Sequence, residues 1–176
     1  SCSIPISSEG AGFITYRADS STGLSATGST NYQLDSTKPM LAGTLSGVTA
    51  SNNWYRSDVS VDVISSDSVS GLAFVSAVVD GGSPMTPDLP IIFPDGIHTL
   101  LLTSYDNAGN ISQVSKIIQV DTITPTVSVA LGGISGTNGW YISTVVVTPS
   151  ANDSSSGIAL LEAMVDGSSW FPINSP

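Results

Sequence analysis

The stretch SDVSVDVISSDSVSGLAFVSAVVDG, residues 57–81, decides the fold of this chain. Valine stands at every second position from Val59 to Val63, which is the period-two pattern of a strand with one buried face. An Asp-Ser-Val-Ser-Gly turn at 67–71 follows, and a second apolar run then ends at Asp80-Gly81. Glycine tolerates positive φ and aspartate hydrogen-bonds its own backbone, so these positions predict tight turns between short strands.

The same landmarks return 86 residues later, because Trp54-Tyr55 recurs as Trp140-Tyr141 and 140 − 54 = 86. The same offset relates Pro39 to Pro125, Asp67 to Asp153, Gly71 to Gly157, and Asp80-Gly81 to Asp166-Gly167. With small insertions, Ile4-Pro5-Ile6, Glu9-Gly10 and Asp35–Pro39 also resemble Leu89-Pro90-Ile91, Asp95-Gly96 and Asp121–Pro125. The sequence therefore predicts tandem repeats with a period of about 86 residues, which would set the whole fold.

The repeat is out of phase with the chain. Residues 1–35 are expected to hold the C-terminal strands of a partial repeat, residues 36–121 a complete repeat, and residues 122–176 the N-terminal strands of another partial repeat. Each end is thus expected to be a split repeat that exposes strand edges and half of a core.

Further strands are expected at 40–45, 89–93, 97–105 and 113–120, with turns at 94–96 and 106–110. Six or seven short antiparallel strands in one repeat predict an all-β fold, with a two-sheet sandwich and Greek-key connections in each repeat. The alternating set Ala73, Val75, Ala77 and Val79 is predicted to face the core. The opposite set is expected to contact another subunit, or to be covered within the domain; it comprises Leu72, Phe74, Val78, Ile158, Leu160 and Met164.

Charge and chemistry exclude several classes of function. Fourteen acidic residues stand against four basic ones, for a net charge of −10, so a nucleic-acid partner is excluded. No apolar run approaches the roughly 20 residues of a membrane-spanning helix, so membrane insertion is not expected. Cys2 is the only cysteine and His98 the only histidine, and no nucleophile elbow or phosphate loop is present. The chain is therefore not expected to be an enzyme or to need a cofactor.

Two groups of residues have a binding interpretation beside a structural one. Asp67, Asp106 and Asp121 could meet at a domain end and bind calcium through carboxylate oxygens, or each could cap its own turn. Trp54, Tyr55, Trp140 and Tyr141 could stack on sugar rings, or could close the core where a strand begins.

Several motifs together resemble the bacterial immunoglobulin-like repeats of large surface and secreted proteins. They are Asn-Gly-Trp-Tyr at 138–141, Asp-Ser-Ser-Ser-Gly-Ile at 153–158, Val-Asp-Gly at 165–167, Asp-Gly-Ile-His-Thr at 95–99, Asp-Asn-Ala-Gly-Asn at 106–110 and Asp-Thr-Ile-Thr-Pro at 121–125. The resemblance implies tandem immunoglobulin-like β-sandwiches at an extracellular or cell-surface location. It also implies roles in adhesins, surface polymers or accessory modules of glycan hydrolases, and in some arrays an interdomain calcium.

The resemblance covers nearly the whole chain, with one departure. Residues Asp19-Ser20-Ser21-Thr22-Gly23 stand where the Asp-Asn-Ala-Gly-Asn turn is expected.

The expected function is structural: a repeating immunoglobulin-like unit of a surface fibre, filament or adhesin stalk. Its end half-domains would be completed in a longer array, within one molecule, or head-to-tail between copies of the chain by strand complementation. The alternative is a glycan-binding accessory module of a secreted or cell-surface protein, with cell-surface glycans as its partner.

Overall fold

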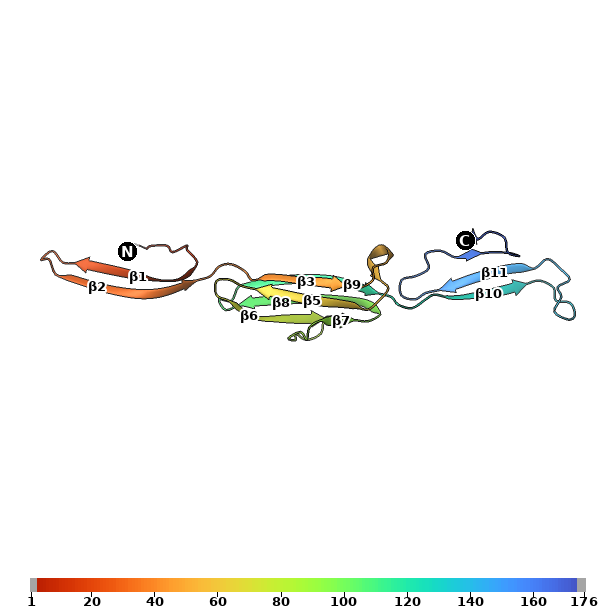
Figure 1. Cartoon of the computed structure of the whole chain (residues 1–176), viewed down its shortest axis with the longest axis horizontal. Coiled ribbons are helices and arrows are strands. Elements are labelled where there is room, and N and C mark those ends of the chain that lie inside the picture. Colours follow the sequence, from red (N-terminus) through yellow and green to blue (C-terminus); the bar gives the residue numbers. More distant parts are fainter. Residues whose placement is uncertain (1–2, 174–176) are drawn as a thin grey trace. The chain divides into compact units, whose positions relative to one another are not determined.

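The computed structural model describes residues 3–173, so Cys2 lies outside the described residues. The fold is all-β, with thirteen strands, one 3-10 turn at Ser51–Asn53 and no α-helix in this range (Figure 1). The residues divide into two compact units, each with most of its contacts inside itself. The first unit comprises the chain up to Gly47, Val59–Phe93 and Ile97–Ile118. The second unit comprises Val48–Asp58, Pro94–Gly96 and the chain from Gln119 onward. The domain limits after residues 35 and 121 stay a prediction.

The first unit begins with a long hairpin. Strands β1 (Gly10–Asp19) and β2 (Ser25–Leu34) pair antiparallel from Gly10 opposite Leu34 to Asp19 opposite Ser25. Two glycines allow aromatic rings to lie across the partner strand, because a Cβ at Gly12 or Gly28 would stand 2.5 Å from ring atoms of Tyr32 or Tyr16. One face of this hairpin therefore carries both tyrosine rings.

Two sheets follow, one with three strands and one with four. The first has the order β3 (Met40–Ser46), β5 (Val59–Ser66), β7 (Ile91–Phe93), and the second has the order β4 (Trp54–Tyr55), β9 (Ile111–Val120), β8 (Gly96–Asp106), β6 (Leu72–Val79). The pairs of β3, β5 and β7 and of β6 with β8 are antiparallel, while β4 runs parallel to β9. This architecture fits a β-sandwich, and it confirms the all-β prediction.

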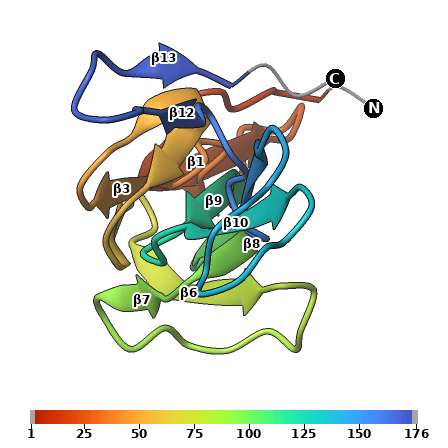
Figure 2. The ribbon, with the colours of Figure 1, turned by 90° about the vertical axis from the view of Figure 1, so that its right-hand side faces the viewer.

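The core lies between residues 59 and 120. The fully buried hydrophobic side chains are Val59, Val61, Ala77, Phe93, Leu100, Leu102, Ile118 and Val120. The hydroxyls of Ser65 on β5 and Ser104 on β8 also meet across the two sheets, 2.6 Å apart. The chain passes from β6 to β7 through residues 80–90, and these two strands lie along the same edge in both views (Figures 1 and 2).

Strand β6 departs from the predicted alternation. Ala77 is buried and Val75 and Val79 are half-buried, as expected for the core face, but Ala73 is exposed. A register shift between Leu72 and Phe74 in the pairing with β8 explains the difference, because a bulge moves the side chains before it to a new orientation.

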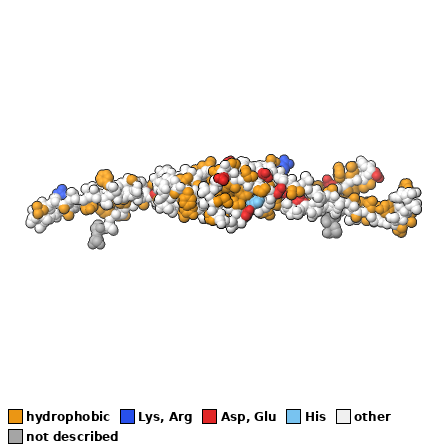
Figure 3. Space-filling model, turned by 90° about the horizontal axis from the view of Figure 1, so that it is seen from below, with side chains coloured by type: hydrophobic (Ala, Val, Ile, Leu, Met, Phe, Trp, Pro, Cys, Tyr) orange, Lys and Arg blue, Asp and Glu red, His pale blue; other side chains and the backbone are white. Residues whose placement is uncertain are grey.

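The second unit contains two further antiparallel pairs, β10 (Thr126–Gly132) with β11 (Val146–Asn152) and β12 (Glu162–Ala163) with β13 (Phe171–Pro172). Its strands leave many apolar side chains open to solvent; Val129 is 61% exposed and Val147 is 55% exposed. Hydrophobic side chains are prominent on the C-terminal strands in the space-filling view (Figure 3).

Backbone geometry recurs at the offset of 86 residues. Hairpin β1–β2 matches β8–β9, since 96 − 86 = 10 and 120 − 86 = 34, and β10–β11 ends at the counterparts of Met40 and Ser66. Arg56 N–H donates to the Val48 carbonyl at 2.8 Å, and Ile142 N–H donates to the Ile134 carbonyl at 2.8 Å.

The φ angles of the turns recur too, at 51° for Asp80 and 50° for Asp166. Even the divergent turn after Asp19 keeps the hydrogen bonds of its counterpart: Ser20 N–H donates to Leu24, as Asp106 N–H does to Asn110.

Candidate functional site

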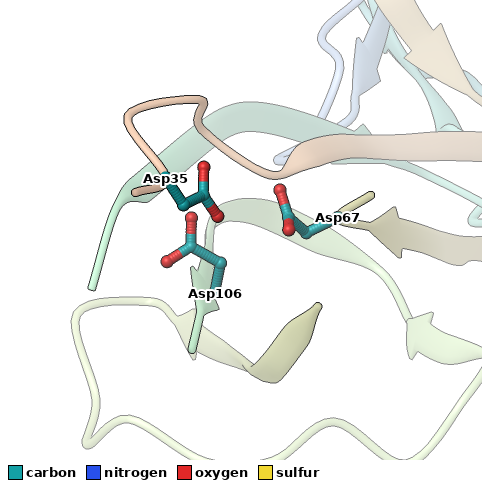
Figure 4. A group of neighbouring side chains, drawn as sticks. All are labelled: Asp35, Asp67 and Asp106. Carbon is teal, nitrogen blue, oxygen red and sulfur yellow. The ribbon is translucent and has the colours of Figure 1, made fainter. Parts of the chain in front are cut away.

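Three carboxylates converge at one end of the central strands. Asp35 follows β2, Asp67 follows β5 and Asp106 ends β8, and one oxygen of each lies within 4.8 Å of the others (Figure 4). Asp106 is 3% exposed, and the other two are half-buried. Converging carboxylates repel one another unless donors or a cation compensate.

Backbone donors supply much of that compensation. Asp67 Oδ1 accepts the N–H groups of Val69, Ser70 and Gly71 at 2.8–3.0 Å. Asp106 Oδ1 accepts the N–H groups of Ala108 and Asn110 at 2.9 and 2.8 Å. Each aspartate thus caps the turn that follows it, which is the structural interpretation of these residues.

The electrostatics of Asp106 reflect two opposing effects. Burial of its carboxyl favours the neutral form, but hydrogen bonds from Asn110, Gly109 and Ala108 outweigh it and lower the pKa of Asp106. The group is therefore ionised at neutral pH. Carboxylate oxygens are the ligands that calcium prefers, so this cluster is where a hard cation would bind. Calcium binding itself stays a prediction.

The cluster differs in membership from the predicted calcium site. The structure places Asp67 and Asp106 close together, and the third carboxylate beside them belongs to Asp35 and not to Asp121. Asp35 lies between β2 and β3, and its Oδ2 accepts Ser70 N–H at 3.0 Å, inside the turn that Asp67 caps. The 86-residue offset in the sequence carried this signal, since it relates Asp35 to Asp121.

Asp121 makes the corresponding contact in the second unit. Its Oδ2 accepts Ser156 N–H at 3.0 Å, and Asp153 Oδ1 accepts the same N–H at 3.0 Å. The hydrogen bonds of Ser156, opposed by burial, lower the pKa of Asp121. Asp121 and Asp153 therefore accept the N–H of Ser156 in the same way as Asp35 and Asp67 accept the N–H of Ser70.

The two aromatic pairs share a backbone geometry but not a setting. Trp54 and Tyr55 are half-buried on β4, opposite Gln119 and Val120 of β9. Trp140 is 76% exposed, while Tyr141 is half-buried. Ala50 N–H donates to Trp54 and Gly136 N–H donates to Trp140, at 2.8 and 2.7 Å. Sugar stacking on these rings stays a prediction.

The side chains predicted to lie opposite the core face of their strands, called the outward stripe from here on, are largely open to solvent. Phe74 is 52% exposed and stacks on Tyr105 with ring centroids 4.4 Å apart. The exposed fractions are 38% for Leu72, 39% for Ile158, 63% for Leu160 and 44% for Met164, whereas Val78 is half-buried. A role of this stripe in subunit contact stays a prediction.

A second apolar surface was not assigned to a site from the sequence. It is the face of β10 and β11 formed by Val127, Val129, Leu131 and Val147, which are 54–75% exposed. An open groove of about 690 Å³ adjoins it, lined by Val147, Pro149, Ala151, Leu161, Ile173 and their neighbours. The 86-residue offset could have identified this face, because Val147 is the counterpart of the fully buried Val61.

Comparison with known proteins adds no relative: no protein-family model matches the chain, and no curated protein is significantly similar to it. Among residues 3–173, no helix has the length and apolar character needed to cross a bilayer.

Proposed function

We propose that this chain is a non-catalytic structural protein, a run of tandem immunoglobulin-like sandwiches in an extracellular fibre, filament or adhesin stalk. Its half-domains are completed by neighbouring chain segments. One observation carries the proposal: Val59 and Val61 are 0% exposed in the complete repeat, while their counterparts Val145 and Val147 are 36% and 55% exposed. A surface that is core in one repeat is uncovered in the next.

The arrangement of strands supports the immunoglobulin-like part of the proposal. In chain order, β3, β5, β6, β7, β8 and β9 take the places of strands A, B, C, E, F and G. With this assignment the sheets read A-B-E and C-F-G, apart from the short β4 beside G, and this order is compatible with an immunoglobulin-like sandwich that has no strand D. The recurrence of strands, turns and hydrogen bonds after 86 residues supports the tandem part.

Energetics favour completion of the half-repeats. Burying a valine or leucine side chain is worth about 1.5–3 kcal/mol, whereas a whole domain is stable by only about 5–15 kcal/mol. The uncovered face of β10 and β11 is therefore large on the scale of domain stability. Its strand edges would also pair with any complementary strand. A completing segment removes both costs, and addition of strands head-to-tail produces a filament.

The resemblance to repeats of surface and secreted proteins supports the extracellular location. The test is to purify residues 1–176 and to follow its mass by light scattering and its shape by electron microscopy as concentration rises. We expect concentration-dependent association into linear polymers. Well-folded monomers at every concentration would overturn the fibre proposal.

One observation favours a second candidate, a glycan-binding accessory module: the Trp140 ring is 76% exposed. This function predicts that a cell-surface polysaccharide quenches tryptophan fluorescence, and that Trp140→Ala removes the quench while Trp54→Ala, at a half-buried position, preserves more of it. Unchanged fluorescence on titration would exclude it.

A further inference from the structure

The turn at residues 137–140 lies in the second unit and contains the only Asn-Gly pair of the sequence, Asn138-Gly139. The φ angles of these two residues are 52° and 81°. The Trp140 N–H donates to the Thr137 carbonyl at 3.1 Å across the turn. Positive φ at both central residues with this hydrogen bond is the geometry of a type I′ turn, for which Asn-Gly is a preferred pair.

An equivalent turn lies 86 residues earlier, at residues 51–54, since 138 − 86 = 52. There Asn52 and Asn53 have φ angles of 55° and 64°, and Trp54 N–H donates to the Ser51 carbonyl. The central residues of both turns are exposed to solvent. The two turns therefore share a backbone geometry and an exposure, and they differ in the residue that follows the first asparagine.

The groups that flank the Asn138-Gly139 peptide are free to react. The Gly139 N–H and the Asn138 side-chain amide make no hydrogen bond with any of residues 3–173. A Cβ built on Gly139 would meet no heavy atom within 4 Å, so the space beside this residue is open. Rotation of the Asn138 side chain can therefore bring its carbonyl carbon, Cγ, toward the Gly139 nitrogen.

We infer that Asn138 is a site of spontaneous deamidation. The Gly139 nitrogen loses its proton to water or hydroxide and attacks Cγ of Asn138, which forms a new C–N bond. Collapse of the adduct breaks the bond from Cγ to Nδ2, and this nitrogen leaves as ammonia with a proton taken from water. Water then opens the resulting succinimide at either carbonyl, giving aspartate or isoaspartate. Asparagine and water thus become an acidic residue and ammonia, and no oxidant or cofactor is needed.

The residue after the asparagine sets the rate of ring closure. The attacking nitrogen is bonded to the Cα of that residue, and a Cβ there crowds the closing ring, whereas glycine has none. Asn53 carries such a Cβ. Asn52 should therefore react roughly tenfold more slowly than Asn138, or slower still, and tenfold corresponds to about 1.4 kcal/mol in activation free energy.

A following glycine is not sufficient by itself, as the turn at Asp80-Gly81 shows. Its φ angles are 51° and 69°, close to those of the Asn138 turn. However, hydrogen bonds from His98 and Thr99, at 2.9 and 2.7 Å, hold the Asp80 carboxylate and lower its pKa. An ionised carboxylate is a poor electrophile, and this one is not free to rotate. Asn138 combines the glycine with a neutral side chain that has no such partners.

The modification changes the loop that carries Trp140. Isoaspartate places an extra methylene group in the main chain, between the Thr137 carbonyl and the Trp140 N–H. The neighbouring bonds from Gly136 N–H to the Trp140 carbonyl, 2.7 Å, and from Ile142 N–H to the Ile134 carbonyl, 2.8 Å, are then displaced from their register. Aspartate keeps the backbone and adds one negative charge to a chain whose net charge is −10.

Peptide mass mapping of the full chain, kept in warm, mildly alkaline buffer made with heavy-oxygen water, tests the site. We expect the peptide with Asn138 to gain the mass of an amide-to-acid change and one heavy oxygen, because water opens the succinimide. Electron-transfer fragmentation should resolve aspartate and isoaspartate products, while the peptide with Asn52 stays unmodified over the same period. An Asn138 that persists in the folded chain, yet reacts when guanidinium chloride unfolds it, would overturn the inference.

Two matched variants test the cause. Gly139→Asn gives this turn the dipeptide of its counterpart and should slow the reaction of Asn138 roughly tenfold or more. Asn53→Gly makes the reverse exchange and should make Asn52 reactive at a rate close to that of Asn138. Both variants should fold, as circular dichroism can verify, because asparagine and glycine both accept positive φ. An unchanged rate in Gly139→Asn, or an unreactive Asn52 in Asn53→Gly, would overturn the inference.

Discussion

Substitution of Gly43 by valine is the sharpest perturbation of the buried core. Gly43 lies on β3 and faces Leu102, and a Cβ there would stand 2.9 Å from Leu102 Cδ1 and 3.6 Å from Val61 Cγ1. Carbon atoms in contact prefer about 3.5–4.0 Å. Leu102 and Val61 are both 0% exposed, so any shift of their side chains must be taken up inside the core. The extra methyl groups of valine must therefore displace packed atoms.

The magnitude follows from two opposing effects. Overpacking a core costs about 1–3 kcal/mol. Replacing a strand glycine recovers about 0.5–1 kcal/mol, because the unfolded chain loses freedom. We expect Gly43→Val to destabilise the protein by about 0–2.5 kcal/mol as the difference of these effects, with the middle of each range giving roughly 1 kcal/mol. The matched control is Val129→Gly, the reverse exchange at the equivalent position, which is 61% exposed and should leave the complete repeat unchanged.

Urea unfolding followed by circular dichroism measures the effect, and a double-mutant cycle tests its cause. Leu102→Ala alone should cost about 2–5 kcal/mol through a cavity. Combined with Gly43→Val, it should cost less than the sum, because each change relieves the defect of the other. A Gly43→Val protein more stable than the wild type, or strictly additive costs, would refute this account of the core.

Three further predictions concern polar groups. Ser65→Ala removes both the partner of the buried Ser104 hydroxyl and a hydrogen bond to the Met40 carbonyl, and it should cost about 1–3 kcal/mol in unfolding free energy. Adding Ser104→Ala should recover the part of this cost that comes from the unpaired Ser104 hydroxyl, and equal loss in both variants would contradict the pairing. Hydrogen bonds lower the pKa of Asp106 below its unfolded value of about 3.9, so the stability that this carboxylate contributes is present above that value and is lost as pH falls through the folded pKa. The acid unfolding curve of Asp106→Asn should therefore be flatter below about pH 4. An unchanged curve would contradict this. Backbone N–H donors already cap Asp67 and Asp106, so removal of calcium by a chelator should not lower the melting temperature measured by calorimetry. A fall in melting temperature that calcium reverses would instead identify the Asp35–Asp67–Asp106 cluster as a calcium site.

Local patterns predicted the strands between residues 59 and 106 well. The alternating valines from residue 59 form β5, the run after Gly71 forms β6, and the expected strand at 97–105 lies within β8. Alternation and turn residues are short-range signals, so they need no knowledge of the rest of the fold. The bulge near Leu72 is different, because it depends on how β6 pairs with β8.

The candidate sites were harder to predict, because they depend on which ends of strands meet. Asp67 and Asp106 were expected to approach each other, and they do, but the linker aspartate beside them is Asp35. The burial of the tryptophans could not be predicted from the sequence either. Trp54 and Trp140 have the same local sequence context, yet only Trp54 lies on a strand that pairs with β9. Trp54 is accordingly half-buried, whereas Trp140 is 76% exposed.

The central claim is that one structural unit recurs and that its split copies are completed by pairing. Amide hydrogen exchange of the full chain, measured over a range of protein concentrations, tests it most directly. The account predicts that protection of β10 and β11 rises with concentration toward that of β3 and β5, together with protection of β1 and β2. Protection of β10 and β11 that stays low and independent of concentration would contradict it.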